Sequence, residues 1–247
     1  MPTVHANGAE IYHEVHGAGE PVLLLHGGFC SLEQMRPQID SLAPRYQVHG
    51  PERPGHGRTP DTDEPFGYTT SVADTLAYMD AVGLKDAHVV GYSDGAIIGL
   101  LIAMHYPERI RSLVAISANL HPSGFVGDDT DNWPPDPDAP DTDSTRAHYE
   151  AFSPDGPEHA DVVVEKLRVL WTSEPDIDPS ALAAITAPTL VIAGDRDVIR
   201  AEHSRLIATS IPSGQLCVVP GAGHGLMEQR TSLVNTVIAE FVDSLAG

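Results

Sequence analysis

One short stretch near the middle of the chain constrains the fold most. A run of strand-forming residues, His88–Val90, leads into Gly91–Gly95, which reads Gly-Tyr-Ser-Asp-Gly, and small and apolar residues typical of a helix follow over 96–105. The sequence therefore predicts a strand, a sharp turn and a helix, with Ser93 at the apex of the turn. The two glycines leave room where the strand and the helix almost touch.

A serine at such a turn has a definite chemical use. The strained backbone of the turn holds the hydroxyl clear of the sheet, where it can act as a nucleophile. The alternative is an ordinary glycine-rich turn, which a bare Gly-x-Ser-x-Gly pattern does not exclude. The strand and helix signals on either side favour a nucleophile at Ser93.

Length and charge narrow the class of protein. The 247 residues suit one domain with an insertion. With 14 Lys and Arg against 35 Asp and Glu, the formal net charge is −21, which repels nucleic acid and anionic membranes. Cys30 and Cys217 are expected to be free thiols. Since no leader pattern and no run of about 18 apolar residues occurs, we expect a soluble cytoplasmic protein.

Strand-like and helix-like segments alternate along most of the chain. This alternation predicts an α/β fold, a mostly parallel sheet with helices on both faces. Asn7-Gly8 predicts a hairpin turn near the start. The expected strands are 4–6, 10–15, 21–25, 46–50, 88–90, 113–117, 188–193 and 216–219, and the expected helices are 32–42, 71–82, 96–105, 156–171, 201–210 and 232–245.

An insertion interrupts this alternation. We expect a core domain made of residues 1–118 and 182–247, and a cap made of residues 119–181. Within the cap, residues 127–144 are rich in Asp and Pro, a composition typical of flexible segments. Their spacing lacks the central Gly and terminal Glu of an EF-hand, so no metal site is predicted there.

The predicted cap helix 156–171 carries an apolar stripe. This stripe either packs against the core domain or roofs the active site, and a cap helix can do both. It consists of Val163, Leu167, Leu170 and Trp171.

Three polar residues lie in loops that follow predicted strands. Ser93, Asp197 and His224 occur in the order nucleophile, acid, base that an α/β sheet of this kind uses for a triad. His224 would take the Ser93 proton through Nε2, and Asp197 would accept the Nδ1 proton of that ring. Asp195 competes for the acid role, and Asn119, at a second acid position, cannot carry the charge.

A glycine pair follows the predicted buried strand 21–25. Glycines let backbone N–H groups approach a reacting oxygen, so we expect Gly28 and Asp94 to supply the two N–H donors of an oxyanion hole. A plain turn is the alternative for this loop. Phe29 and Trp171 are candidate substrate contacts, together with the Asp94 side chain.

Five loops, taken together and in order, resemble those of the α/β-hydrolase fold superfamily. That resemblance implies a serine hydrolase that acts on a small molecule and needs no cofactor or metal. The Gly91–Gly95 turn, the nucleophile elbow, resembles that of valacyclovir hydrolase-like esterases. This resemblance implies that the Asp94 side chain recognises an ammonium group. The alternative is that Asp94 contributes only its backbone N–H and caps the following helix. The loops are Leu25–Gly28, Gly55–Gly57, Gly91–Gly95, Gly194–Asp197 and Gly221–His224.

The resemblance leaves more than one reaction open. Hydrolysis of a small carboxylic ester or lactone through an acyl-enzyme is the leading hypothesis. Cofactor-free haloperoxidase or perhydrolase chemistry and hydrolysis of a C–C bond use the same triad. A non-catalytic receptor for a small ligand is the alternative from another class. The sequence makes no prediction of oligomeric state.

Overall fold

The computed structural model describes residues 2–126 and 142–245. The Asp- and Pro-rich segment predicted over 127–144 falls almost entirely outside these ranges, and side chains are described again from Thr145. No helix among the described residues combines the length and the hydrophobicity needed to span a bilayer.

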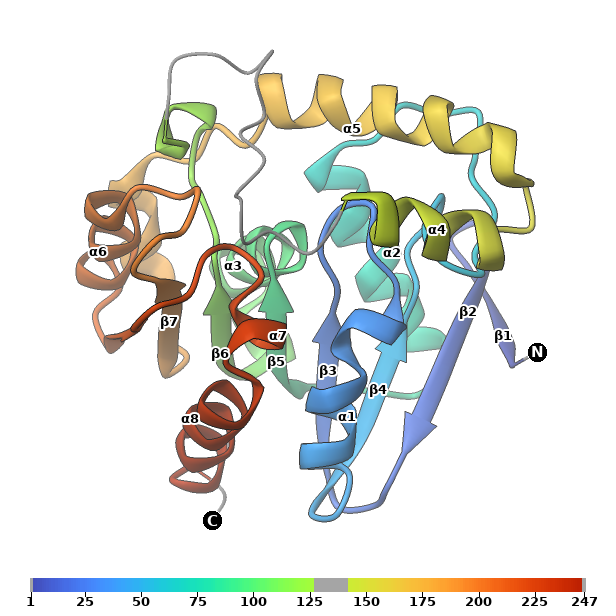
Figure 1. The fold of residues 1–247 in the computed structure, drawn as a ribbon. Coiled ribbons are helices and arrows are strands. Elements are labelled where there is room, and N and C mark those ends of the chain that lie inside the picture. The colour runs from blue at the N-terminus through green and yellow to red at the C-terminus, as the bar shows by residue number, and fades with distance from the viewer. Residues whose placement is uncertain (1, 127–141, 246–247) are drawn as a thin grey trace.

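A single sheet of eight strands forms the centre of the described chain (Figure 1). Its order is β1-β2-β4-β3-β5-β6-β7-β8. The pairs β1–β2 and β2–β4 are antiparallel, and all pairs from β4 to β8 are parallel, as the alternation of strands and helices predicts. The strands are β1 Thr3–Ala6, β2 Ala9–His16, β3 Glu20–Leu25, β4 Tyr46–Pro51, β5 Ala87–Tyr92, β6 Ile110–Ile116, β7 Thr189–Gly194 and β8 Gly214–Val219.

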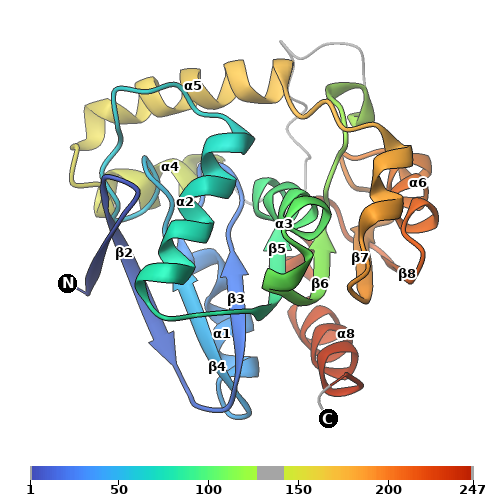
Figure 2. The ribbon, with the colours of Figure 1, turned by 180° about the vertical axis from the view of Figure 1, so that it is seen from behind.

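Helices cover both faces of the sheet. Figure 1 shows α1 and α8 in front of it, and Figure 2 shows α2, α3 and α6 on the opposite face. Each face has its own apolar cluster, because the central strands β3, β5 and β7 are buried on both sides. The α-helices are α1 Arg36–Leu42, α2 Tyr68–Ala81, α3 Asp94–His105, α4 Thr142–Phe152, α5 Ala160–Ser173, α6 Ala201–Ser210, α7 Leu226–Gln229 and α8 Thr231–Asp243.

Several local predictions are confirmed. Asn7 and Gly8 have φ values of 47° and 84°, as the hairpin turn between β1 and β2 requires. The predicted helix 32–42 is a 3₁₀ turn followed by α1, and Ser31 accepts a bond from the Glu33 N–H at 3.3 Å.

Two differences concern the segment above the sheet. α5 begins at Ala160 rather than at Gly156, because Gly156 has φ 89°, outside the helical region, and Pro157–His159 form a 3₁₀ turn. α4 is not among the predicted helices. Its described part is mostly polar and exposed, and Tyr149 is the large apolar side chain that it buries, so it lacks a clear apolar stripe.

Both helices lie over the edge of the sheet where the parallel strands end (Figure 1). The apolar stripe of α5 is buried, with Val163, Leu167 and Leu170 each less than 5% exposed. These side chains belong to the same apolar cluster as those of α2 and α3. The carboxyl ends of the strands are therefore covered, which is where open α/β sheets bind ligands.

An ion pair joins α1 to β2. Arg36 donates from both terminal nitrogens to Glu14, over 2.6 and 3.1 Å, and the Tyr12 hydroxyl donates to the same carboxylate at 2.7 Å. The bonds from Arg36, helped by those from Tyr12 and His16, hold the pKa of Glu14 well below its usual range.

This shift makes stability depend on pH. Because the pKa of Glu14 is lower in the folded than in the unfolded chain, its contribution is complete above about pH 5 and is lost as pH falls toward the folded pKa. We expect Glu14→Gln to lower the free energy of unfolding by about 1–3 kcal/mol at pH 7 and by progressively less toward pH 2. Urea unfolding at several pH values measures this. Glu10→Gln, an exposed change on the same strand, should cost about 0.5 kcal/mol or less, and equal effects of the two variants would contradict the prediction.

Candidate active site

The turn between β5 and α3 holds Ser93 in an unusual conformation. Its φ is 52° and its ψ −116°, outside the regions that serine normally adopts. Crowding explains the glycines on either side. A Cβ on Gly91 would lie 2.3 Å from the Gly95 carbonyl oxygen, and a Cβ on Gly95 would lie 2.0 Å from the carbonyl oxygen of Leu25 at the end of β3. Only glycine fits these two positions.

The loops after β7 and β8 bring two more polar residues to Ser93. His224 Nε2 lies 3.1 Å from Ser93 Oγ, and His224 Nδ1 lies 2.9 Å from Asp197 Oδ1. A carboxylate accepts hydrogen bonds and does not donate, so Nδ1 carries the proton in this arrangement and Nε2 is free to accept one. The geometry is that of a nucleophile, a base and a group that orients the base.

The Asp197 carboxylate is buried and accepts several hydrogen bonds. Its Oδ1 accepts from Ile199 N–H at 3.1 Å, and its Oδ2 accepts from Ser117 Oγ at 2.5 Å and from Gly194 N–H at 3.4 Å. Burial raises the pKa of Asp197, but the His224 ring and the bonds from His224 and Ser117 outweigh it, so the pKa stays below its usual value. Asp197 is therefore an anion at neutral pH.

Asp195, the competing acid, and Asn119, at the second acid position, make other hydrogen bonds. Asp195 is exposed and accepts a bond from Ala222 N–H at 3.1 Å. Asn119 donates to the His121 carbonyl at 3.1 Å. The residue that sequence reasoning missed is Ser117, which ends the strand predicted over 113–117 and donates to the acid.

Arg53 fixes the loop that follows β3. Its guanidinium donates to the His26 and Gly27 carbonyls, and its backbone N–H donates to His26 Nε2 at 3.0 Å. The other ring nitrogen of His26 then carries the proton and donates to Gly27 O at 2.8 Å. Burial, followed by the charge of Arg53, lowers the pKa of His26 well below its usual value, so this ring is a neutral structural element.

Gly28 lies where this loop meets α3 and α5. A Cβ there would be 2.4 Å from the Trp171 ring and 2.6 Å from Asp94 Oδ2. Asp94 is the first residue of α3, and the backbone N–H of a first residue has no acceptor inside its helix. The structure thus places Gly28 beside Asp94, the residue that follows Ser93.

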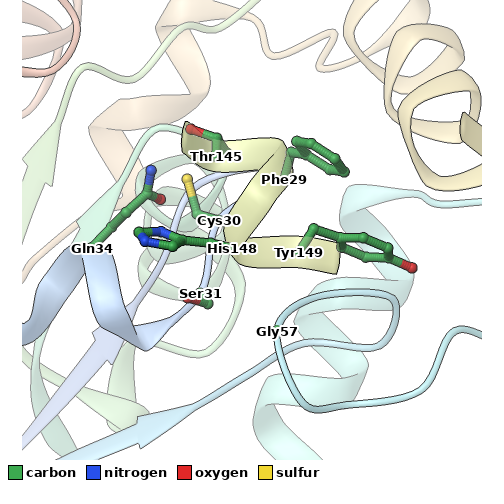
Figure 3. Close-up of a pocket in the computed structure, with 8 residues that line it drawn as sticks. All are labelled: Phe29, Cys30, Ser31, Gln34, Gly57, Thr145, His148 and Tyr149. Carbon is green, nitrogen blue, oxygen red and sulfur yellow. The ribbon is translucent and has the colours of Figure 1, made fainter. Parts of the chain in front are cut away.

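Phe29 contacts the helix above it. Figure 3 draws its ring beside that of Tyr149 of α4. The two rings stack, with 5.3 Å between their centroids and 18° between their planes. The small pocket drawn there also includes Cys30, Gln34 and His148 and has a volume of about 10 Å³, the space of one water molecule. Burial raises the pKa of Cys30 to about 12, so this thiol is not a nucleophile at neutral pH.

The Asp94 side chain is occupied within the protein. It is 3% exposed, and its Oδ1 accepts from the Tyr68 hydroxyl and from Trp171 Nε1, each at 2.9 Å. Its Oδ2 lies 3.6 Å from the Arg53 guanidinium. Since the carboxylate is already compensated and hydrogen-bonded, these contacts argue against its use as the receptor of a substrate ammonium group.

A family-wide sequence model covers most of the chain. The model of the alpha/beta hydrolase family matches residues 22–236. The chain belongs to the alpha/beta hydrolase family. The α/β-hydrolase fold and a hydrolase role, both predicted from the five loops, are therefore confirmed.

The chain is similar in sequence to a putative hydrolase and to a haloperoxidase, and similar in structure to a further hydrolase. The putative carbamate hydrolase RutD of Azorhizobium caulinodans is 40% identical over 126 residues, 51% of this chain and 48% of that protein, so the chain spans about half the length of this relative. The non-heme haloperoxidase of Rhodococcus erythropolis is 27% identical over 99% of this chain and 100% of its own. The meta-cleavage product hydrolase of Pseudomonas fluorescens shares the fold, with a TM-score of 0.82, 21% identity and coverage of 100% and 98%.

The two donors to Asp94 Oδ1 make a matched pair for mutation. Trp171 belongs to α5 above the sheet, whereas Tyr68 belongs to α2 beside it. We expect Trp171→Phe, which keeps an aromatic ring and removes the N–H, to loosen α5 and raise its amide hydrogen exchange about tenfold. Tyr68→Phe should leave exchange in residues 160–173 unchanged. Hydrogen-exchange mass spectrometry of residues 160–173 measures the difference between the two variants. An equal rise in exchange in both variants would show that the Trp171 N–H does not hold α5 in place.

Proposed function

We propose that the chain is a serine hydrolase that cleaves a small carboxylic ester or lactone through an acyl-enzyme. The observation that carries the proposal is the continuous hydrogen-bonded chain from Ser93 Oγ to His224 at 3.1 Å and on to Asp197 at 2.9 Å. Serine alone is a weak nucleophile at neutral pH, and this chain supplies the base and the group that orients it.

The proposed steps use these hydrogen bonds in order. His224 Nε2 accepts the Ser93 proton as Oγ attacks the carbonyl carbon, and Asp197 stabilises the imidazolium that forms. The backbone N–H groups of Gly28 and Asp94 hold the developing oxyanion. His224 then protonates the leaving oxygen, which departs as the alcohol. In the second half, His224 takes a proton from water, the hydroxide attacks the acyl-enzyme, and Ser93 recovers its proton as the acid leaves.

The helices above the sheet act as the cap in this proposal. Residues 119–181 form the insertion, and α4 and α5 roof the site. Trp171 lies against Gly28, and Phe29 stacks under α4, so these two rings border the space where an acyl or alcohol group would lie. Aromatic and apolar walls with a few directed polar groups are typical of small-molecule sites.

Carbamate hydrolysis and perhydrolysis are the nearest chemical variants. The first has support from the name of the RutD relatives, and the second from that of the haloperoxidase relative. Both need the same nucleophile and base. A panel of p-nitrophenyl esters, lactones and carbamates, with peracid formation measured in parallel, ranks them by kcat/KM.

The nucleophile gives the first test. We expect a fluorophosphonate probe to label Ser93, and Ser93→Ala to lower kcat/KM on the preferred substrate by at least about a thousandfold, since the triad acts as a unit. Ser123→Ala, an exposed serine outside the triad, should leave both unchanged. Turnover that survives in a folded Ser93→Ala protein would overturn the proposal, and absence of labelling in the folded wild type would favour a receptor.

Ser117 gives a test of the acid. We expect Ser117→Ala to lower kcat about tenfold with KM little changed, because Asp197 loses a donor and holds the His224 ring less firmly. Ser112→Ala removes another buried hydroxyl from the same strand, one that bonds His88 at 2.8 Å far from the triad, and should leave kcat unchanged. Steady-state kinetics separate the two. An equal loss in both variants would assign Ser117 a general structural role instead.

A further inference from the structure

The end of the sheet at β8 is open. β8 is the last strand in the order and pairs with β7 alone, as Figure 2 shows beside α6. In the described chain its backbone bonds go to β7, to the loop after β7 and to the turn before β8 itself. About half of the N–H and C=O groups of such an end strand point away from its neighbour. The outer edge of residues 215–218 therefore offers backbone donors and acceptors to another strand.

The opposite edge of the sheet is better protected. β1 has four residues, Pro2 precedes it and α2 packs against it. Short strands, charged residues, Pro and covering helices are the means by which proteins keep sheet edges from pairing with other chains. β8 has six residues and contains no charged residue and no Pro, although Pro220 after it ends the run. β8 is thus the edge that can accept an added strand.

Apolar side chains are exposed at this end of the sheet. Leu216 and Val218 of β8 are 39% and 49% exposed, and Leu206 of α6 is 39% exposed. Leu216 and Val218 point to one face of the sheet, since they are two residues apart. Cys217 between them packs against the apolar cluster of the other face. Leu216 and Val218 therefore lie on the face that α6 covers, where Ile207 joins the cluster of α2 and α3.

The local charge here differs from that of the whole chain. Residues 198–219 contain two Arg and one Glu, a net charge of +1, whereas the chain carries −21. Two copies of so acidic a chain repel each other over their acidic surfaces, and this segment avoids that repulsion. Glu202 and Arg205 are exposed on α6, and neither forms an ion pair with a described residue. Their spacing places both beside Leu206 on one side of the helix.

We propose that β8 pairs antiparallel with β8 of a second copy of this chain, which joins the two sheets into one. A two-fold axis perpendicular to the sheet relates the strands and keeps both α6 helices on the same face. With Cys217 on the axis, Leu216 of each copy lies opposite Val218 of the other, and both are covered. The two α6 helices then run antiparallel, with Glu202 of one near Arg205 of the other. This surface goes beyond the proposed hydrolysis, because it contains no residue of the triad.

The mass of the native protein in solution tests the pairing. Sedimentation equilibrium of the wild type should give twice the mass of one chain. Val218→Lys places a charge on the edge and should raise the dissociation constant of the dimer about a hundredfold, because a two-fold interface contains each change twice. Val169→Lys makes the same change at a side chain of α5 that is 51% exposed, and should leave the dissociation constant unchanged. Both positions are on the surface, so both variants keep the fold.

Exchange of charge tests the two-fold arrangement. Arg205→Glu and Glu202→Arg should each raise the dissociation constant about tenfold, because each turns attraction into repulsion, and the variant that carries both changes should recover the wild-type value. A double variant as weak as the single ones would overturn the arrangement. A monomeric wild type would leave the edge to a strand of another protein and overturn the proposal, as would equal weakening by Val218→Lys and Val169→Lys. None of these outcomes changes the Ser93→Ala result, so the hydrolase proposal is tested separately.

Discussion

Close backbone contact at the turn after β5 is the constraint on which the site depends. Because Gly95 lies against the last carbonyl of β3, the turn and the loop after β3 cannot move independently. Ser93 is thereby held in a strained conformation, and its backbone N–H donates to the Ile116 carbonyl at the end of β6. Steric contact therefore fixes Ser93, the proposed nucleophile, relative to the loop that carries Gly28, a proposed oxyanion donor.

Two buried charged residues, Arg53 and Asp94, lie beside that turn. Arg53 is almost fully enclosed and donates to two carbonyls of the loop after β3, and Asp94 supplies the nearest negative charge. An enclosed ion pair is tolerated only when its remaining atoms are hydrogen-bonded. Tyr68 and Trp171 provide those bonds, so the same carboxylate that compensates Arg53 also holds α5 over the site.

The sequence predicted the eight strands and the helices other than α4 and α7, because each has a local signal in its periodicity. The hairpin at Asn7-Gly8 and the loops that carry Ser93, Asp197 and His224 have a local signal in their glycines. The sequence did not predict the partners of Asp94 or the role of Ser117. The donors Trp171 and Ser117 are separated from their acceptors by 77 and 80 residues. No local pattern marks such a pair, and only the folded sheet brings it together.

Parallel pairing of β6 and β7 explains why Asp197 accepts a hydrogen bond from the end of the neighbouring strand. β6 and β7 run in the same direction with Ile116 opposite Ile192, so their carboxyl ends meet at one edge. Ser117 follows β6 directly and has φ 55°, and its hydroxyl reaches Asp197 beyond the end of β7. In this chain Asn119 occupies the second acid position, after β6, and cannot carry the charge, while the Ser117 hydroxyl at the end of the same strand donates to Asp197. The negative charge at Asp197 is thus stabilised by a neutral donor from the end of β6, whereas a second carboxylate there would repel it.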